Sequence, residues 1–190
     1  AGDPGDSNLD LIRKKILHSH SIDEKEYDTE IIGSSPKRLE AFLQGRVAAA
    51  MLTPPSSDRA LVAGGVMLAD AENYVPNWPL TCGWALRPWL VSHRPIVVRF
   101  IRAWVAATDW LCESANREEC LSLIMEQEKL THAAAQNAYE KVVPKARINP
   151  SALNTVIELR KEMGVYQPPH SPVERFYDES YWREATGLSM

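Results

Sequence analysis

Serine-rich segments at two predicted helix starts are the residues best suited to bind an anion. Ser7 and Asn8 open one predicted helix, and Ser34 and Ser35 precede another whose first residue is Pro36. The first turn of a helix offers backbone N–H groups without intrahelical partners and a partial positive charge, and the hydroxyl groups add donors. These segments predict binding of a carboxylate, sulfonate or phosphate. The structural alternative is that the serines only cap their helices.

Two further groups could complete such a site. Thr53 and Pro54 follow an apolar run that indicates a buried strand, and ligands of α/β proteins bind beyond the carboxyl ends of strands. Trp78 could stack on a planar ligand and Arg87 could clamp a carboxylate, although packing in a core or hinge is the alternative for the tryptophan. The candidate ligand-binding residues are Ser7, Asn8, Gly33, Ser34, Ser35, Thr53, Pro54, Trp78 and Arg87.

Signatures of catalysis and of metal binding are missing from the sequence. It has no nucleophile elbow, P-loop, dinucleotide fingerprint, H-E-x-x-H or C-x-x-C pattern, and its 5 histidines are scattered. Its 3 cysteines are an odd number at loose spacing, which is not typical of a disulfide framework or a zinc site. We therefore expect no catalytic residue, no metal ligand and no cofactor, while a pairing of Cys112 with Cys120 stays open.

The elements that would position the central candidates, from Gly33 to Pro54, lie between Ile31 and Leu68. Pro36 at the first helical position and Gly45 after the last one bound a helix, with Lys37 and Arg38 off its apolar face. Residues 47–52 and 66–68 are apolar, as strands covered on both faces are. Alternation of short strands and helices predicts a parallel sheet.

Helical patterns dominate the rest of the chain. Ser7 caps a helix that begins at residue 8, Pro95 opens a long helix to about residue 114, and Asn116 with Glu119 forms a capping box for the next helix. Three more helices are indicated by Thr131, by Pro150 with Gly164, and by Asp178. Residues 80–86 could form one more strand.

Several of these segments resemble one protein family. They are Arg38-Leu39-x-Ala41, Leu43-x-Gly45-x-Val47-x-Ala49-x-Met51-Leu52-x-Pro54-Pro55, Gly64-x-Val66-x-Leu68-Ala69-Asp70 and Val97-Val98-Arg99-Phe100-Ile101-Arg102-Ala103. The chain resembles, over nearly its whole length, the periplasmic substrate-binding proteins of ABC importers. The branch in question binds nitrate, aliphatic sulfonates, taurine and thiamine-pyrimidine precursors. Many relatives carry acidic residues where this chain has Ala48 and Thr53, which favours an anionic or uncharged ligand.

The resemblance implies an α/β fold of the type II periplasmic-binding-protein class, with a parallel-sheet lobe followed by a helical C-terminal region. Residues 1–75 would form the second lobe without its first strand. Residues 76–190 would form the crossover and the mainly helical part that completes the first lobe. Because relatives are longer at the N-terminus, we expect that this chain is a fragment.

The function implied by the resemblance is capture of a small, anionic or aromatic solute for an ABC importer, without catalysis. The expected partners are that solute and the importer's permease. A net charge of −4 argues against nucleic acid, and the lack of a long apolar run argues against direct membrane insertion. The intact protein would be periplasmic, or extracellular and either lipid-anchored or secreted, although this chain shows no signal peptide. The alternatives are an enzyme on the same fold, similar to a thiamine-pyrimidine synthase or a decarboxylase, and a non-transport ligand-sensing domain.

Overall fold

The computed structural model describes residues 7–79 and 82–188, and these residues are mainly helical. The described part is 61% helix and 1% strand, and it contains no sheet. The predicted α/β fold of the type II periplasmic-binding-protein class, with its parallel-sheet lobe, is therefore wrong. Of the predicted strand at residues 80–86, positions 80 and 81 lie outside the described residues and positions 82–86 are irregular.

The apolar segments expected to be strands make side-chain contacts in place of strand pairing. The backbone carbonyl of Met51 accepts a hydrogen bond from the Arg38 Nε at 2.7 Å, and the backbone N–H of Thr53 donates to the Ser35 Oγ at 3.0 Å. Leu68 is 81% exposed, so the segment at 66–68 is not covered on both faces as a central parallel strand would be. Apolar composition alone did not distinguish a buried strand from an extended loop.

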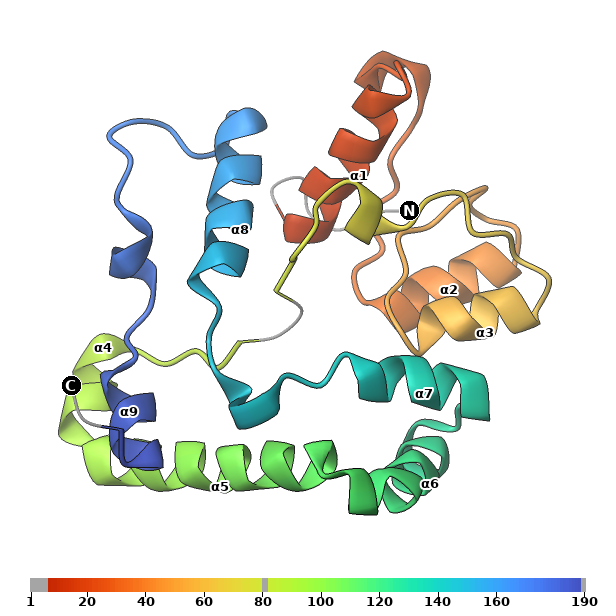
Figure 1. The fold of residues 1–190 in the computed structure, drawn as a ribbon. Coiled ribbons are helices and arrows are strands. Elements are labelled where there is room, and N and C mark those ends of the chain that lie inside the picture. Colours follow the sequence, from red (N-terminus) through yellow and green to blue (C-terminus); the bar gives the residue numbers. More distant parts are fainter. Residues whose placement is uncertain (1–6, 80–81, 189–190) are drawn as a thin grey trace. The chain divides into compact units, whose positions relative to one another are not determined.

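Local start and stop signals predicted most helices correctly. The described residues contain α1 Asn8–Ser19, α2 Ser35–Leu43, α3 Ser56–Val62, α4 Arg87–Ser92, α5 Arg94–Cys112, α6 Arg117–Glu128, α7 His132–Glu140, α8 Pro150–Glu162 and α9 Ser180–Thr186 (Figure 1). Five short 3-10 helices connect them: η1 Glu24–Glu26, η2 Ala71–Asn73, η3 Ser114–Asn116, η4 Pro144–Ala146 and η5 Val173–Phe176. The predicted capping box before α6 does not form, because Asn116 makes no side-chain cap and its amide donates to the Trp110 carbonyl at 2.9 Å.

The first of two compact units comprises Ala1–Trp78 and Ser151–Ser171. Its core joins α1 to α8: Leu11, Ile12 and Ile16 pack with Val75 and Leu159, and all five are buried. At the exposed rim, the Lys15 ammonium donates to the Glu162 carboxylate at 2.6 Å. α2 and α3 form a separate packed pair in this unit, side by side in Figure 1.

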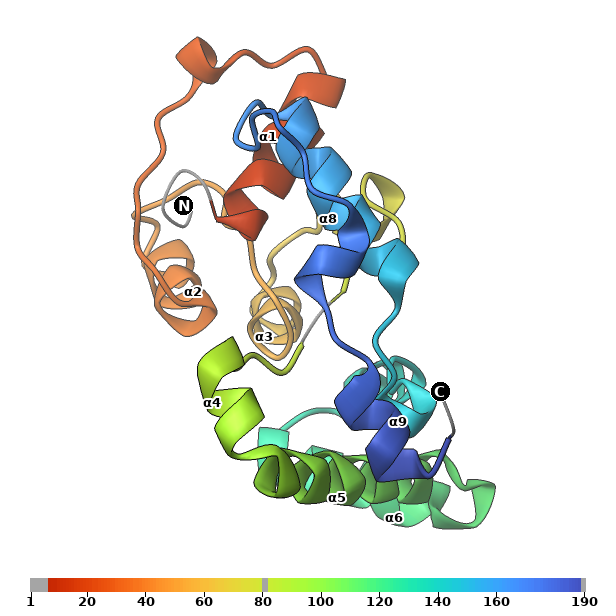
Figure 2. The same cartoon turned by 90° about the vertical axis from the view of Figure 1, so that its left-hand side faces the viewer.

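The second unit comprises Pro79–Pro150 and Pro172–Met190. α5 and α9 lie side by side in this unit (Figure 2). Its core lies between them, where Val98 packs with Tyr181 and Ala185. The Arg94 guanidinium lies 4.3 Å from the centre of the Tyr181 ring and donates to Glu184 at 2.7 Å. These contacts cover one side of α5. None of the described helices is long and apolar enough to cross a membrane.

Candidate functional site

The N-terminus of α2 is the place where the structure brings predicted site residues together. Gly33 adopts a positive φ of +94°, which turns the chain into the helix. Ser34 is the exposed N-cap but makes no side-chain cap hydrogen bond. Ser35 accepts a hydrogen bond from the backbone N–H of Thr53 at 3.0 Å. The backbone N–H groups of Ser35 and Lys37 in the first turn of α2 are therefore not capped by a serine side chain, and Pro36 between them has no N–H.

A second helix begins at the same junction. The carbonyl of Thr53 accepts hydrogen bonds from the N–H groups of Ser56 at 2.9 Å and Ser57 at 3.2 Å, which starts α3 directly after Pro54 and Pro55. Because Ser35 holds Thr53 against the start of α2, the N-terminal ends of both helices lie close together. The positive end of each helix dipole lies at this place. The first turn of α2 contains no acidic residue, whereas the first turn of α3 contains Asp58, whose charge offsets the contribution of that helix.

The buried side chain of Arg38 links the two backbone segments that meet at this junction. Its side chain is 1% exposed, and its guanidinium donates to the carbonyls of Gly33 and Met51. The sequence pattern placed Arg38 off the apolar face of α2 and gave no sign that it is buried. A planar guanidinium can bond two backbone segments at once, whereas an aliphatic residue on the same face could pack but not bond.

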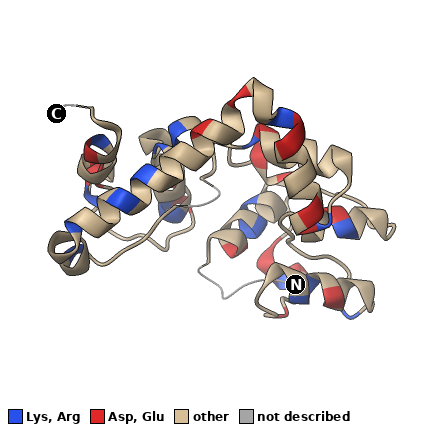
Figure 3. Cartoon of the chain, turned by 90° about the horizontal axis from the view of Figure 1, so that it is seen from below, with Lys and Arg blue, Asp and Glu red and all other residues tan. Residues whose placement is uncertain are grey.

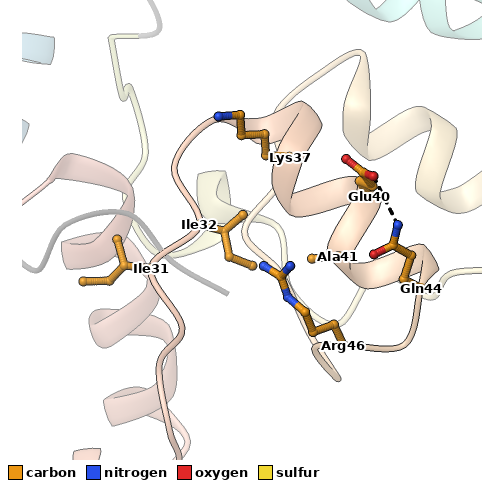
Figure 4. A pocket seen from close by; sticks show the side chains of 7 residues that line it. All are labelled: Ile31, Ile32, Lys37, Glu40, Ala41, Gln44 and Arg46. Atoms are coloured by element: carbon orange, nitrogen blue, oxygen red, sulfur yellow. Dashed lines mark hydrogen bonds between the residues drawn. The ribbon is translucent and has the colours of Figure 1, made fainter.

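A pocket of about 330 Å³ opens along α2 beside this junction (Figure 4). Its size is at the lower end of the range for small-molecule sites. The lining combines an apolar wall with cationic, acidic and amide side chains: Ile31, Ile32, Lys37, Glu40, Ala41, Gln44 and Arg46. Lys37 stands in the first turn of α2 and Arg46 just past its end, so cationic groups stand at both ends of the helix.

The C-terminal turn of α2 explains how Arg46 comes to line the pocket. Gly45 has a φ of +69°, its N–H donates to the Phe42 carbonyl, and the N–H of Arg46 donates to the Ala41 carbonyl at 2.9 Å. This is the Schellman arrangement, which folds the chain back over the last turn of the helix. The Arg46 guanidinium pairs with Glu30 at 2.9 Å, but both side chains are about half exposed. Such a surface pair is weak and exchanges readily.

The candidate residues at the N-terminus of α1, by contrast, already have hydrogen-bond partners within the protein. The Ser7 hydroxyl accepts a hydrogen bond from the backbone N–H of Asp10 at 3.2 Å. Asp10, in the first turn, is 1% exposed and accepts from Arg13 at 2.6 and 3.0 Å. The Asn8 side chain accepts from Arg160 at 3.4 Å. Ser7 and Asn8 thus have structural contacts, and a buried carboxylate stands where an anion would bind.

Trp78 and Arg87 belong to different units and have structural contacts in each. Trp78 packs on the core formed by α1, Val75 and Leu159. Arg87 donates to the Arg175 carbonyl at 2.7 Å. Burial alone would raise the pKa of Asp178, but hydrogen bonds from Ser180 and the charges of Arg87 and Arg94 lower it overall. Arg87 therefore stabilises the segment that leads into α9.

Sequence reasoning missed Lys37 and Arg46 as candidate site residues. The available signal was the Gly45 stop, which the sequence predicted and which implies that the next residue returns over the helix. No group of three or more His, Cys, Asp or Glu side chains within residues 7–79 and 82–188 is placed to hold a metal ion. Cys82, Cys112 and Cys120 are free thiols, and burial raises the pKa of Cys120.

Comparisons of the chain with protein-family models, with curated proteins and with solved structures found no match.

Proposed function

We propose that the chain binds a small anionic solute in the pocket along α2, with the anionic group at the first turn of that helix. The observation that carries the proposal is the pocket itself, which is lined by Lys37 and Arg46 and opens beside an N-terminus that no serine caps. In the cell, this binding would serve as the solute-capturing step of an ABC importer, as the sequence resemblance implies. The protein's location would then be periplasmic or extracellular.

The polar groups at the pocket favour an anion over a cation. The backbone N–H groups of Ser35 and Lys37 in the first turn of α2 and the ammonium of Lys37 are donors, and the positive end of the α2 dipole points the same way. The carboxylate of Glu40 already accepts a hydrogen bond from the Gln44 amide at 3.1 Å. A solute with one carboxylate or sulfonate meets these donors, and its carbon skeleton packs on Ile31 and Ile32.

A binding role without turnover matches the groups at the pocket. Neither a histidine nor a cysteine lines it, and no serine of the junction lies beside a base in the contacts described. Reversible binding needs only donors and a shaped surface. The enzyme alternative, a synthase or decarboxylase, would need groups that transfer protons or form bonds.

The test combines calorimetric titration of the full chain with one matched pair of variants. The probes are ethanesulfonate, nitrate, benzoate and an aminopyrimidine. In Ser34→Asp, the new carboxylate caps α2 and stabilises it by about 1 kcal/mol, but it repels an anion from the first turn. We expect binding of the preferred anion to weaken at least about tenfold, because the anion loses a charge-assisted hydrogen bond from the N–H group that the new carboxylate caps. A tenfold change corresponds to about 1.4 kcal/mol. Lys37→Gln should weaken it in the same direction.

Ser7→Asp is the control, because it makes the same change at the N-cap of α1. Its affinity for the anion should equal that of the unchanged chain. Equal weakening in both serine variants would contradict the α2 site. Preference for the uncharged aminopyrimidine over every anion, or conversion of any probe to product, would reject the proposed function.

A further inference from the structure

Two cationic side chains line the pocket along α2, and they belong to opposite ends of that helix. Lys37 stands in the first turn, and Arg46 follows the stop at Gly45. A rise of about 1.5 Å per residue places Lys37 and Leu43 about 9 Å apart along the helix axis. Figure 4 shows Ala41 between the two cationic side chains. A solute with one anionic group at the first turn of α2 therefore has no charged partner for Arg46 at the other end.

The structure pairs Arg46 with a carboxylate of the chain itself. The Nη2 atom of Arg46 lies 2.9 Å from Oε1 of Glu30, and the two side chains are 52% and 48% exposed. Glu30 directly precedes the apolar wall of Ile31 and Ile32 and is not among the residues that line the pocket. An ion pair this exposed contributes little free energy and can be replaced by another carboxylate. The planar guanidinium can then bind the incoming carboxylate through two parallel hydrogen bonds.

The acidic residue that lines the pocket has a partner of its own. The Glu40 carboxylate accepts a hydrogen bond from the Gln44 amide, one turn further along α2, at 3.1 Å. Figure 3 shows basic and acidic residues interspersed along the helices of the described chain, and the net charge is −4. A broad positive field therefore does not draw anions to this protein. Attraction of a second anionic group depends on direct contact with Arg46.

We propose that the preferred solute is a dianion, whose second carboxylate or sulfonate replaces Glu30 on Arg46. This inference rests on the proposed function, which places the first anionic group at the first turn of α2. The segment between the two groups packs on the apolar wall of Ile31 and Ile32. Because the solute and Glu30 compete for one guanidinium, Glu30 is an internal competitor that lowers the affinity for dianions more than the affinity for monoanions.

Calorimetric titration of the full chain with pimelate and heptanoate at neutral pH tests this inference. The two probes have the same number of carbon atoms and differ in one carboxylate. The unchanged chain should bind pimelate about fivefold more tightly than heptanoate, because only pimelate reaches Arg46 with a charged group.

Removal of the internal competitor should increase the preference for the dianion. Glu30→Gln should raise the ratio of the pimelate affinity to the heptanoate affinity by a further factor of about two to five, the worth of an exposed ion pair. Asp28→Asn is the matched control, because it removes one negative charge from a nearby exposed position in the same segment. It should leave the ratio unchanged. An equal rise in both variants would overturn the inference, since the effect would then be one of net charge.

Arg46→Gln should reduce the same ratio to about one, and adding Glu30→Gln should then change nothing, because Glu30 acts through Arg46. Unfolding midpoints should shift little, since both side chains are about half exposed. A ratio that Arg46→Gln leaves as it is in the unchanged chain would overturn the inference. Binding of heptanoate or ethanesulfonate with no preference for pimelate would overturn the inference alone, whereas binding of no anion at all would reject the proposed function as well.

Discussion

Arg38 shows how a single side chain replaces the pairing of two strands. It is an arginine with almost no exposed surface, and it bonds the carbonyl of Gly33 before α2 and that of Met51 before α3. Because the charge of the guanidinium is shared over two carbonyl groups, its burial is compensated by strong hydrogen bonds. The helix pair and its pocket both depend on this contact.

Arg38→Met should destabilise the chain strongly, although methionine nearly fills the same volume. The partly buried carbonyls of Gly33 and Met51 would lose their donor, and each unsatisfied group costs about 1–3 kcal/mol, so we expect a total loss of about 2–6 kcal/mol. Urea unfolding followed by circular dichroism measures the change. Arg175→Met removes an exposed arginine of η5 and should shift the unfolding midpoint little. Similar midpoints for both variants would contradict the role of Arg38.

The two ends of α2 determine which groups line its pocket. Ser34 leaves the first turn open, while Gly45 ends the helix and returns Arg46 to the pocket. The positive φ of +69° at Gly45 is a conformation that residues with a Cβ adopt at a cost. The stop signal therefore serves both stability and the position of the cation.

Gly45→Ala should reduce the free energy of unfolding by about 1–2 kcal/mol, the cost of a left-handed conformation for an L-residue. No neighbouring atom lies within 4 Å of the added Cβ, so the effect reports backbone strain alone. Gly83→Ala is the matched control, because its Cβ also meets open space and its φ is not positive. It should be neutral or slightly stabilising, through a less flexible unfolded chain. Chemical denaturation of both variants decides the matter, and equal losses would exclude strain at Gly45.

The whole molecule consists of two compact units with a small core in each. The first unit includes α8, which lies late in the sequence, and Leu159 of α8 packs against α1. The second unit joins α5 to α9, where Val98 packs against Tyr181. Each core therefore depends on residues far apart in sequence, and each should respond to its own substitutions.

Leu159→Ala should create a cavity and cost about 2–5 kcal/mol, mainly in the first unit. Hydrogen exchange followed by mass spectrometry should show faster exchange in α1 and little change in α5 and α9. Val98→Ala provides the reciprocal measurement, with faster exchange in α9 and little change in α1. If Leu159→Ala accelerated exchange equally in both units, the two cores would unfold together and the division would fail.

Residues at the helix ends are sufficient to predict where most helices begin and end. The start and stop signals act within one turn of their own position, so the local sequence contains all of the information that they carry. They are Ser7, Pro36, Thr131, Pro150 and Gly164. The conformation of the apolar segments at 47–52 and 66–68, in contrast, depends on contacts with other parts of the chain. A strand needs partners, and here the Arg38 guanidinium and the Ser35 hydroxyl satisfy backbone groups of that first segment and its end at Thr53.

The candidate site divides in the same way. The sequence identified the serines at both helix starts, but it could not tell a capped N-terminus from an open one. That difference depends on where the Ser7 and Ser34 hydroxyls point and on the burial of Asp10. Lys37 and Arg46 lie near opposite ends of α2. They line one pocket because the segment with Ile31 and Ile32 folds against the same side of the helix. Hydrogen bonds at helix ends depend on residues within one turn, so they can be predicted from the local sequence. Contacts between segments far apart in the chain depend on tertiary packing and cannot.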